Sequence, residues 1–294
     1  MNVNPASGGV WAANTWDGIN KAVEREAGQI RVVQKVFRAM RVPGARYVSI
    51  DQVEGDDPIR IEEGATRPFA EIQGRFQLTQ AQIENEATGQ PGRKLARIVA
   101  KNLALAEDLV LLRGKDILQD KDVTGDGSTP LSPKIQAINP DSVREGLLKE
   151  AKSNYIGVPP SFPPADFFQH VLGGITRLTG QGKSEPYALL MADDAHVKLH
   201  RAAGGSSATF LTTIKQAVAG GLFPTRALRR PQSKGEVFGL LAALGDESVS
   251  IYVESEPCVA FTQRETNGMF QFRVSERVQY VVRDEKALLR FVYE

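Results

Sequence analysis

The sequence predicts an α+β protein with one large or two medium-sized domains. Of its 294 residues, 41% are hydrophobic, which is enough to build buried cores on that scale. Two long segments carry apolar residues at helical spacing, and other segments alternate apolar and polar residues as half-buried strands do. No internal repeat is evident in the sequence.

The charge balance and the single cysteine narrow the functional classes. Thirty-six Lys and Arg face 35 Asp and Glu, for a formal net charge of +1. This argues against nucleic acid or an anionic membrane as the main partner. One cysteine, Cys258, excludes an intramolecular disulfide framework and fits a reducing compartment, and beside Pro257 we expect it to be a buried structural thiol.

Nothing in the sequence predicts secretion or a membrane span. The first residues lack a basic stretch followed by an apolar one, as a secretory signal requires. The longest apolar run, 237–244, is far shorter than the roughly 18 residues that cross a bilayer. We therefore expect a soluble, cytoplasmic protein.

The first predicted element is one long amphipathic helix from Trp16 to Met40. Thr15 is its expected N-cap, and Pro43-Gly44 ends it. Its apolar residues fall three, four and seven apart, on one face: Trp16, Ile19, Val23, Ile30, Val33, Phe37 and Met40.

A two-stranded arm is predicted next. Residues 47–53 and 59–62 are extended, and a turn at 63–68 leads into a strand from Ala70 to Leu78 with a period of two. An isolated two-stranded ribbon is marginal in water, and its open edges favour pairing. The arm therefore needs either the protein's own core or a neighbouring subunit to lie on.

A buried helix is predicted from Arg93 to Arg113, closed by Gly114. At about 1.5 Å per residue it is roughly 30 Å long, and it is apolar over much of its circumference. Residues 115–165 are rich in turn formers and proline, and we expect an insertion or exposed excursion there, with a short helix at 141–152.

The remaining sequence predicts an α/β lobe and then long strands. A helix at 165–179, a buried strand at 186–191 and a helix at 193–201 form the lobe. Strands follow at 249–253, 270–282 and 287–293, and Glu276 alone interrupts the apolar alternation of the second.

Candidate chemical sites in the sequence are weak. His196 and His200 stand four apart and could share a metal, but no third ligand is evident, so we favour a solvated helix face. The acidic run 120–127 resembles a calcium loop without its closing Glu, and an ordinary turn explains it better. No phosphate loop and no nucleophile with a base and an orienting group is present. We expect no catalytic, metal or cofactor site.

Four parts of the chain, in order, resemble the encapsulin family, which includes the linocin-type bacteriocins. They are RVPGARYVSIDQV (41–53) with RPFAEIQGRFQLTQAQIENE (67–86), ARIVAKNLALAEDLVLLRGK (96–115), SEPYALLMADDAHVKLHRAA (184–203), and the C-terminal strands from SVSIYVESEPC to DEKALLRF (248–291). The resemblance implies the tailed-phage capsid fold, closed into an icosahedral nanocompartment shell by many copies of the chain. It also implies a cargo enzyme, often a peroxidase or a ferritin-like protein, held through a short apolar targeting peptide.

The resemblance also implies a division of the chain. We expect an N-terminal interior helix segment (1–44), a peripheral domain (45–53 and 76–165, with an insertion at 116–164), an extension loop (54–75), an axial domain (166–235), and C-terminal strands that complete the peripheral domain (236–294).

Site residues follow from the same resemblance. The cargo peptide would bind a groove at Ile30, Val33 and Phe37. The extension loop would contact the neighbouring subunit through Ile59, Ile61, Phe69 and Ile72. A neutral pore on the fivefold axis would be lined by Gly204, Gly205, Ser206 and Ser207. Ala81 stands where family members can carry a flavin-stacking Trp, so we expect no flavin.

Two alternatives stay open. A phage or prophage major capsid protein has the same fold and packages DNA; the N-terminus without a scaffolding-like domain and the near-neutral charge favour an encapsulin. A soluble hydrolase is a second alternative, which the missing catalytic set disfavours.

Overall fold

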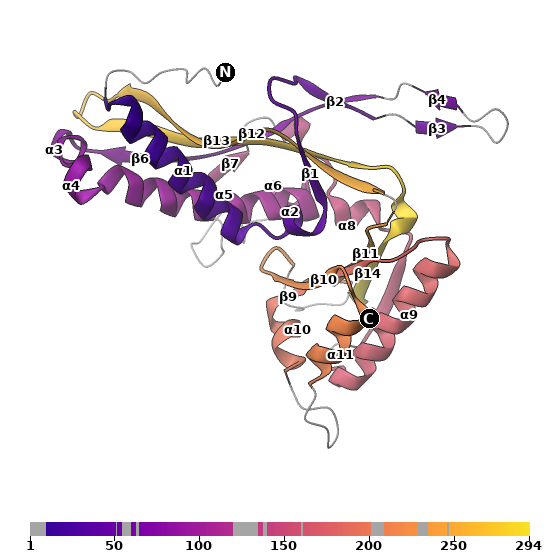
Figure 1. The fold of residues 1–294 in the computed structure, drawn as a ribbon. Coiled ribbons are helices and arrows are strands. Elements are labelled where there is room, and N and C mark those ends of the chain that lie inside the picture. The colour runs from indigo at the N-terminus through magenta and orange to yellow at the C-terminus, as the bar shows by residue number, and fades with distance from the viewer. Residues whose placement is uncertain are drawn as a thin grey trace.

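The computed structural model describes residues 10–50, 52–54, 60–62, 65–119, 135–137, 140–159, 161–200, 209–228, 235–245 and 247–294. Within them the chain forms two lobes, and a narrow two-stranded ribbon projects from the first (Figure 1). Each lobe contains one five-stranded sheet. The predicted mixture of helices and strands is confirmed.

The first lobe is a sheet backed by the longest helix. Its strand order is β1-β12-β13-β6-β7, with β1 parallel to β12 and the other neighbours antiparallel. Helix α5 packs against β6 and β13, and α1 packs against α5 and β12 (Figure 1). The strands are β1 (Arg38–Arg41), β6 (Ala70–Leu78), β7 (Ile135–Ala137), β12 (Val249–Arg264) and β13 (Phe270–Val282); the helices are α1 (Ala13–Ile30), α2 (Val33–Val36), α3 (Gln80–Glu84), α4 (Glu86–Gly89), α5 (Pro91–Arg113), α6 (Asp116–Gln119) and α8 (Leu147–Glu150), with a 3-10 turn at Pro140–Ser142.

Helix α5 confirms the prediction of a long buried helix. Pro91 occupies its first turn, where a missing N–H costs nothing, and the helix ends before Gly114. The N–H of Gly114 donates to the carbonyl of Val110 at 2.9 Å. A Cβ at Gly114 would lie 2.0 Å from the carbonyl oxygen of Arg144, so the close crossing of two backbones requires glycine here. In the described part of the chain no helix has both the length and the apolar character that crossing a membrane requires.

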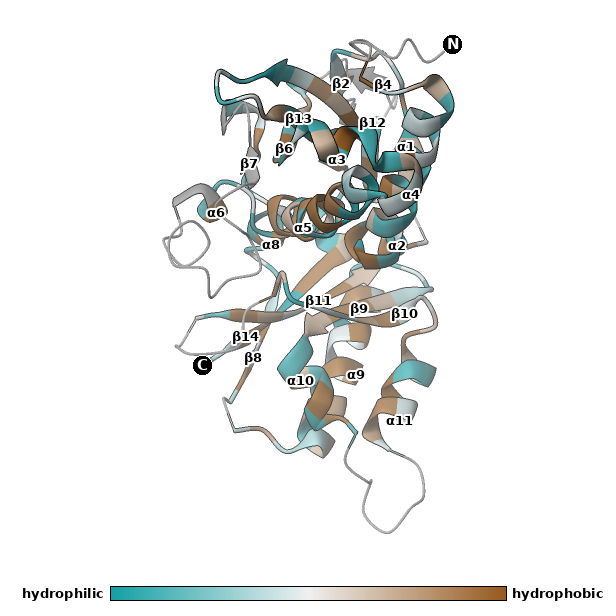
Figure 2. Ribbon diagram, turned by 90° about the vertical axis from the view of Figure 1, so that its left-hand side faces the viewer, coloured by the Kyte–Doolittle hydropathy of each residue, from teal (hydrophilic) through white to brown (hydrophobic). Residues whose placement is uncertain are grey.

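The second lobe is a sheet covered by helices on the side away from the first lobe (Figure 2). Its strand order is β10-β9-β11-β14-β8. Phe167, Phe238 and Phe291, from a helix and two strands, are fully buried together in its core. The strands are β8 (Tyr155–Val158), β9 (Tyr187–Ala192), β10 (Gly221–Thr225), β11 (Val237–Ala243) and β14 (Leu288–Tyr293); the helices are α9 (Pro164–Gly180), α10 (Asp193–Lys198) and α11 (Phe210–Ala217), with a 3-10 turn at Glu285–Ala287.

The C-terminal segment supplies strands to both sheets. We expected residues 236–294 to complete the peripheral domain. Strands β12 and β13 do lie in the first sheet, but β11 and β14 lie in the second. The chain passes between lobes twice in this segment, and one continuous apolar core joins them.

The described part of the predicted insertion is not an exposed excursion. Strand β7 extends the first sheet, and β8 pairs with β14 at the edge of the second. Val143, Leu147 and Val158 are each at most 1% exposed. Turn-forming residues and prolines misled the prediction, because short strands and single helical turns between them still bury their apolar side chains.

The ribbon is shorter than predicted. It consists of β2 (Tyr47–Ser49) paired with β5 (Thr66–Pro68), and β3 (Gln52–Glu54) paired with β4 (Arg60–Glu62). The strand from Ala70 to Leu78 does not belong to it. This strand is β6, which lies inside the first sheet between β13 and β7 and is mostly buried.

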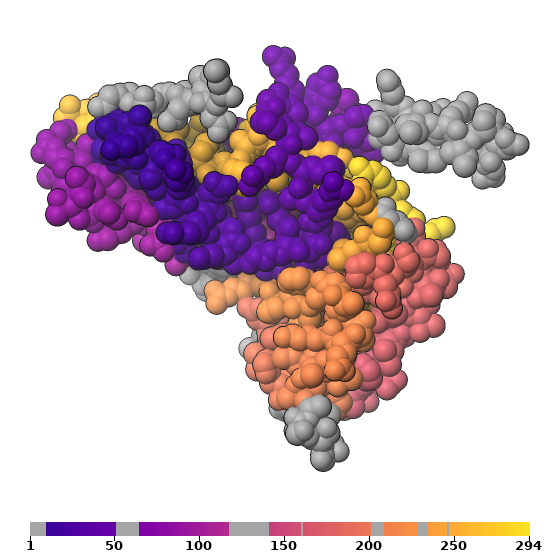
Figure 3. All heavy atoms as spheres, in the orientation of Figure 1, coloured from indigo at the N-terminus to yellow at the C-terminus, as the bar shows by residue number. Residues whose placement is uncertain are grey.

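The N-terminal helix ends ten residues earlier than predicted. Helix α1 ends at Ile30, a second short helix α2 follows, and then β1 pairs in parallel with β12. The predicted apolar face of α1 is confirmed, since Trp16, Ile19 and Val23 are at most 2% exposed. A space-filling view shows the N-terminal segments covering this face of the first lobe (Figure 3).

Candidate functional site

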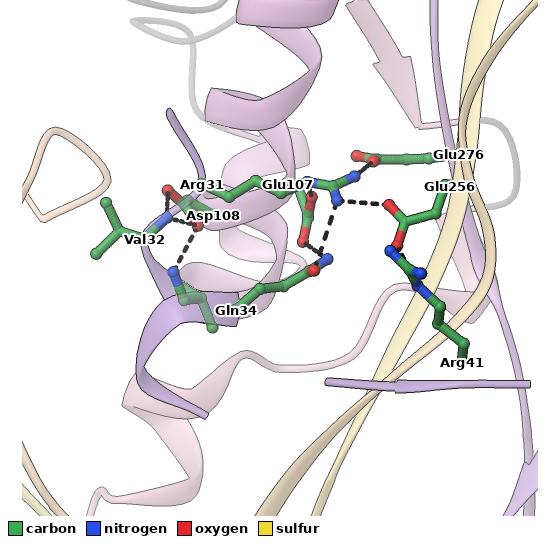
Figure 4. Close-up of polar contacts among 9 residues, drawn as sticks. Arg31, Val32, Gln34, Arg41, Glu107, Asp108, Glu256 and Glu276 are labelled. Atoms are coloured by element: carbon green, nitrogen blue, oxygen red, sulfur yellow. Dashed lines mark hydrogen bonds and ion pairs between the residues drawn. The ribbon is translucent and has the colours of Figure 1, made fainter. Parts of the chain in front are cut away.

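A cluster of buried charges ties the N-terminal segment to the rest of the first lobe. Arg31, between α1 and α2, is its centre (Figure 4). Its Nε lies 2.5 Å from Oε2 of Glu107 on α5, and its Nη1 donates to Glu256 on β12 at 2.8 Å. Its Nη2 donates to Glu276 on β13. One guanidinium therefore joins three elements that are far apart in sequence.

Asp108 decides where α2 begins. Its carboxylate accepts the N–H of Val32 at 2.9 Å and that of Val33 at 2.9 Å. The first N–H groups of a helix have no partner within the helix. The carboxylate of Asp108, on α5, accepts them here and so caps α2 in place of a side chain at its own N-cap position. The neighbouring Gln34 donates its amide to Glu107 at 2.5 Å. The tertiary contact thus interrupts the long helix that apolar spacing predicted.

The cluster contains more buried acid than buried base. Arg31 is 5% exposed, whereas Glu107, Asp108 and Glu276 are at most 1% exposed. Burial raises the pKa of Glu107 and of Glu276, and burial together with Glu107 raises the pKa of Asp108 to about 7. Burial opposes charge on Arg31, yet Glu276, Glu107 and Glu256 outweigh it and hold the Arg31 pKa above its ordinary value.

A solvent-accessible cavity of about 430 Å³ lies beside the cluster. Arg31, Gln34 and Glu256 line its inner side. Its outer rim comes from α1, the start of α2 and β1, and consists of Lys21, Glu24, Arg25, Gly28, Lys35 and Arg41. Arg41 closes the outer edge by donating its Nε to Glu256 at 3.0 Å.

The comparisons with known proteins fit this architecture. Residues 139–279 match the Linocin_M18 family, described as encapsulating protein for peroxidase. A search of curated proteins finds no significant match. Among solved structures, a virus-like particle from Pyrococcus furiosus aligns with a TM-score of 0.66 at 12% identity, covering 94% of this chain and 98% of that one.

Phage structures align almost as completely. A chain from the structure of Mycobacterium phage Bobi gives a TM-score of 0.61 at 14% identity, over 90% of this chain and 91% of that one. The capsid of Myoviridae phage XM1 gives 0.59 at 12% identity, over 89% and 91%. The resemblance to the encapsulin family is confirmed. The solved structures show that the fold is the tailed-phage capsid fold. The match to a family of encapsulating proteins supports a shell-forming protein.

The predicted cargo groove needs correction within this encapsulin-like fold. Val33 is fully buried and Phe37 is 3% exposed, both in the main core. They cannot line an open groove in the subunit as it stands, because the break at Arg31 turns this part of the chain inward. Ile30 is half-buried at the end of α1 and stays a prediction.

The predicted extension-loop contacts are partly wrong, because some of the predicted residues are buried within their own subunit. Phe69 and Ile72 are 2% and 1% exposed within their own subunit, so they are core residues. Ile61 lies in β4 of the ribbon, and Ile59 lies outside the described residues. Among the side chains of the ribbon that the structure describes, Tyr47 on β2 is a large apolar one that is 57% exposed.

Other predicted features can be placed briefly. The pore residues Gly204, Gly205, Ser206 and Ser207 lie outside the described residues, as does the acidic run 120–127. Rings of His196 and His200 meet edge to face at 5.2 Å, but in the described ranges no group of three or more potential ligands could hold a metal ion. Cys258 is exposed on β12, so the prediction of a buried thiol is wrong.

The sequence alone marks several residues of the charge cluster, but it does not show that they contact one another. Glu276 occupies an inward position in the alternation of β13, between Val274 and Val278. The alternation by itself therefore predicts that Glu276 is buried. Glu107 and Asp108 interrupt an otherwise apolar helix. Charged residues at core positions predict a buried partner, since uncompensated charges are rarely buried. Nothing in the sequence identifies that partner as Arg31.

Proposed function

We propose that this chain assembles with copies of itself into a closed icosahedral nanocompartment that encloses a cargo enzyme. The observation that carries the proposal is the match of residues 139–279 to a family of encapsulating proteins, within a capsid fold that spans 94% of the chain. The role is structural: the shell acts by repetition and by burying surfaces between subunits, and no catalytic step is part of it. As an encapsulin-type shell it would act in the cytoplasm.

The ribbon supports assembly on physical grounds. In the described part of the chain, β2 pairs only with β5 and β3 only with β4, and the ribbon projects away from both lobes (Figure 1). Two-stranded ribbons are marginally stable in water, and exposed strand edges tend to pair. A neighbouring subunit would bury Tyr47 and supply the surface that the ribbon lacks within its own chain.

For the cargo, we propose a peroxidase-type enzyme carrying a short targeting peptide. The family's description supports the enzyme class. The peptide would attach on the face formed by α1, beside Ile30 and the cavity above the charge cluster. The polar rim of that cavity makes a mixed apolar and charged peptide a better fit than the purely apolar one that the sequence suggested.

The direct test is negative-stain electron microscopy of the protein expressed alone and purified by size. Uniform closed particles are expected. Co-expression with the enzyme encoded beside it should then place that enzyme inside the particles, and deleting its terminal peptide should leave the particles empty. A monomer or dimer at high concentration would contradict the proposal.

A phage-type capsid that packages DNA is the second candidate. The alignment to the capsid of Myoviridae phage XM1, over 89% of this chain and 91% of that one, favours it specifically. Nuclease-treated particles from the native host distinguish the two: protected DNA of uniform length indicates a capsid, whereas a co-purifying enzyme without DNA indicates a nanocompartment. Terminase and portal genes beside the gene for this protein would likewise indicate a phage capsid.

A further inference from the structure

The buried charge cluster is electrostatically unbalanced. With all groups ionised, one guanidinium, that of Arg31, faces three carboxylates that are at most 1% exposed, those of Glu107, Asp108 and Glu276. Removing a charge from water without a compensating partner is costly enough that such a group usually takes up a proton instead. At least one of these three carboxyl groups must therefore stay protonated while the cluster is buried.

Neighbouring charges do not correct the imbalance. The charged groups around the cluster are engaged elsewhere or exposed; on α5, Arg97 and Lys101 both pair with Glu26 on α1. On β12, Glu256 is shared between Arg31 and Arg41, and on β13, Arg277 pairs with Glu254 at 3.2 Å. From α1, Glu24 meets Arg41 at 3.4 Å, and from α2, Lys35 donates its Nζ to the carbonyl of Gln29.

The position of the extra proton follows from the contacts. Both oxygens of Asp108 accept backbone N–H groups, which favours its charged form and partly offsets the burial that raises its pKa. Oε1 of Glu276 is buried and has no hydrogen-bond partner within the described residues. A proton on Glu276 lets it donate a hydrogen bond to Glu107, the carboxyl with which it shares Arg31.

We propose that this cluster is a pH-controlled latch. While the cluster holds its extra proton, residues 31–41 stay docked on α5 and on the β12–β13 hairpin. When rising pH removes that proton, residues 31–41 are released. The cavity beside Arg31 and Glu256 gives solvent access to the cluster without unfolding the lobe. Helix α1 keeps its own apolar contacts through Trp16, Ile19 and Val23, so release is confined to the segment after it.

The direction of the effect follows from linkage. The pKa of Glu276 is raised in the docked state because of burial first and Glu107 second, and it returns to its ordinary value once the segment opens. The docked state therefore binds more protons than the open state at any pH between those two values. In that window docking weakens as pH rises, and the opening constant grows about tenfold per pH unit for one proton.

Hydrogen exchange of the purified assembly, followed by mass spectrometry at pH 5 and pH 7 and corrected for intrinsic exchange rates, tests the latch. For peptides covering 31–41, the opening constant should rise with pH in the wild type, by up to about 100-fold between these values for one proton. Glu276→Gln keeps the size and hydrogen-bonding groups of the protonated acid but cannot titrate. In this variant the rise should be smaller by at least about tenfold.

Glu24→Gln is the matched control, because Glu24 borders the same cavity but is 51% exposed; its rise should equal that of the wild type. A Glu276→Gln rise within about threefold of the wild type would overturn the proposal. If that variant does not fold, the infrared carbonyl band of a protonated carboxyl in the wild type at pH 6 decides, and its absence refutes the latch. Both measurements apply to whatever oligomer is purified, so they do not depend on shell formation.

Discussion

Replacing Arg31 with methionine should be among the most damaging single substitutions in the first lobe. Methionine is unbranched and replaces the aliphatic stem of arginine, but it is shorter and removes the positive charge. Glu107 and Glu276, at 0% and 1% exposure, would then be buried without a counter-charge. The ion pair of Glu107 with Arg31 and the hydrogen bond from Arg31 to Glu276 would be lost as well.

The magnitude follows from that burial. Removing one partner of a buried ion pair costs about 3–5 kcal/mol, because the remaining charge stays out of water. The carboxyls can escape part of this cost by taking up protons, so the loss should be smaller at pH 5 than at pH 8. The difference arises because the pKa of each of these carboxyls is already raised by burial in the wild type.

Urea titration followed by tryptophan fluorescence is a suitable assay, since Trp11 and Trp16, the two tryptophans of the chain, pack together at the start of α1. Arg38→Met is the matched control: Arg38 pairs with Glu247, but the two side chains are 64% and 57% exposed. An exposed pair contributes about 0–1 kcal/mol, so this variant should be close to the wild type. Adding Glu107→Gln to Arg31→Met should restore part of the stability.

The reasoning would be refuted if Arg31→Met and Arg38→Met lost similar free energy of unfolding. It would also be refuted if the loss in Arg31→Met were independent of pH. Either result would mean that the buried carboxyls find compensation that the contacts of the cluster do not show.

Three further predictions concern packing, backbone and assembly. Trp16→Ala should lower the free energy of unfolding by about 3–5 kcal/mol, because Trp16 is 2% exposed and its ring packs at a tilt against that of Phe272, with 6.0 Å between centroids; the same urea titration measures it. Gly146→Ala should cost about 1–3 kcal/mol or more, since its φ is +86° and a Cβ would lie 2.5 Å from the carbonyl carbon of Arg113; circular dichroism melting checks it, and an unchanged melting temperature would contradict the close approach. Tyr47→Ala should change subunit stability by less than about 0.5 kcal/mol yet reduce the fraction of closed particles counted by microscopy, and undiminished assembly would remove Tyr47 from the proposed interface.

Local patterns in the sequence determined several elements of this protein. Apolar spacing and Gly114 predicted α5 within two residues at its start and with its correct end. Strict alternation predicted β13. These predictions succeed because a helix or strand with one buried face repeats that face in its sequence, whatever it packs against.

The order of elements also determined the fold class. Matching segments between residues 41 and 291 resemble the encapsulin family in their order along the chain. Individual spacing could not do this, since amphipathic helices and alternating strands occur in many folds. What distinguished this chain was a ribbon, a long buried helix and long C-terminal strands in one order.

Tertiary structure alone decided what those faces contact. The apolar spacing of residues 16–40 is the same whether the helix is continuous or broken, and only the carboxylate of Asp108, 75 residues from Val33, starts a second helix. That break turns Val33 and Phe37 into the core and brings Arg31 to Glu276, 245 residues away. Sequence patterns report which side of an element is apolar, but a buried ion pair depends on distances between elements, which only the folded chain sets.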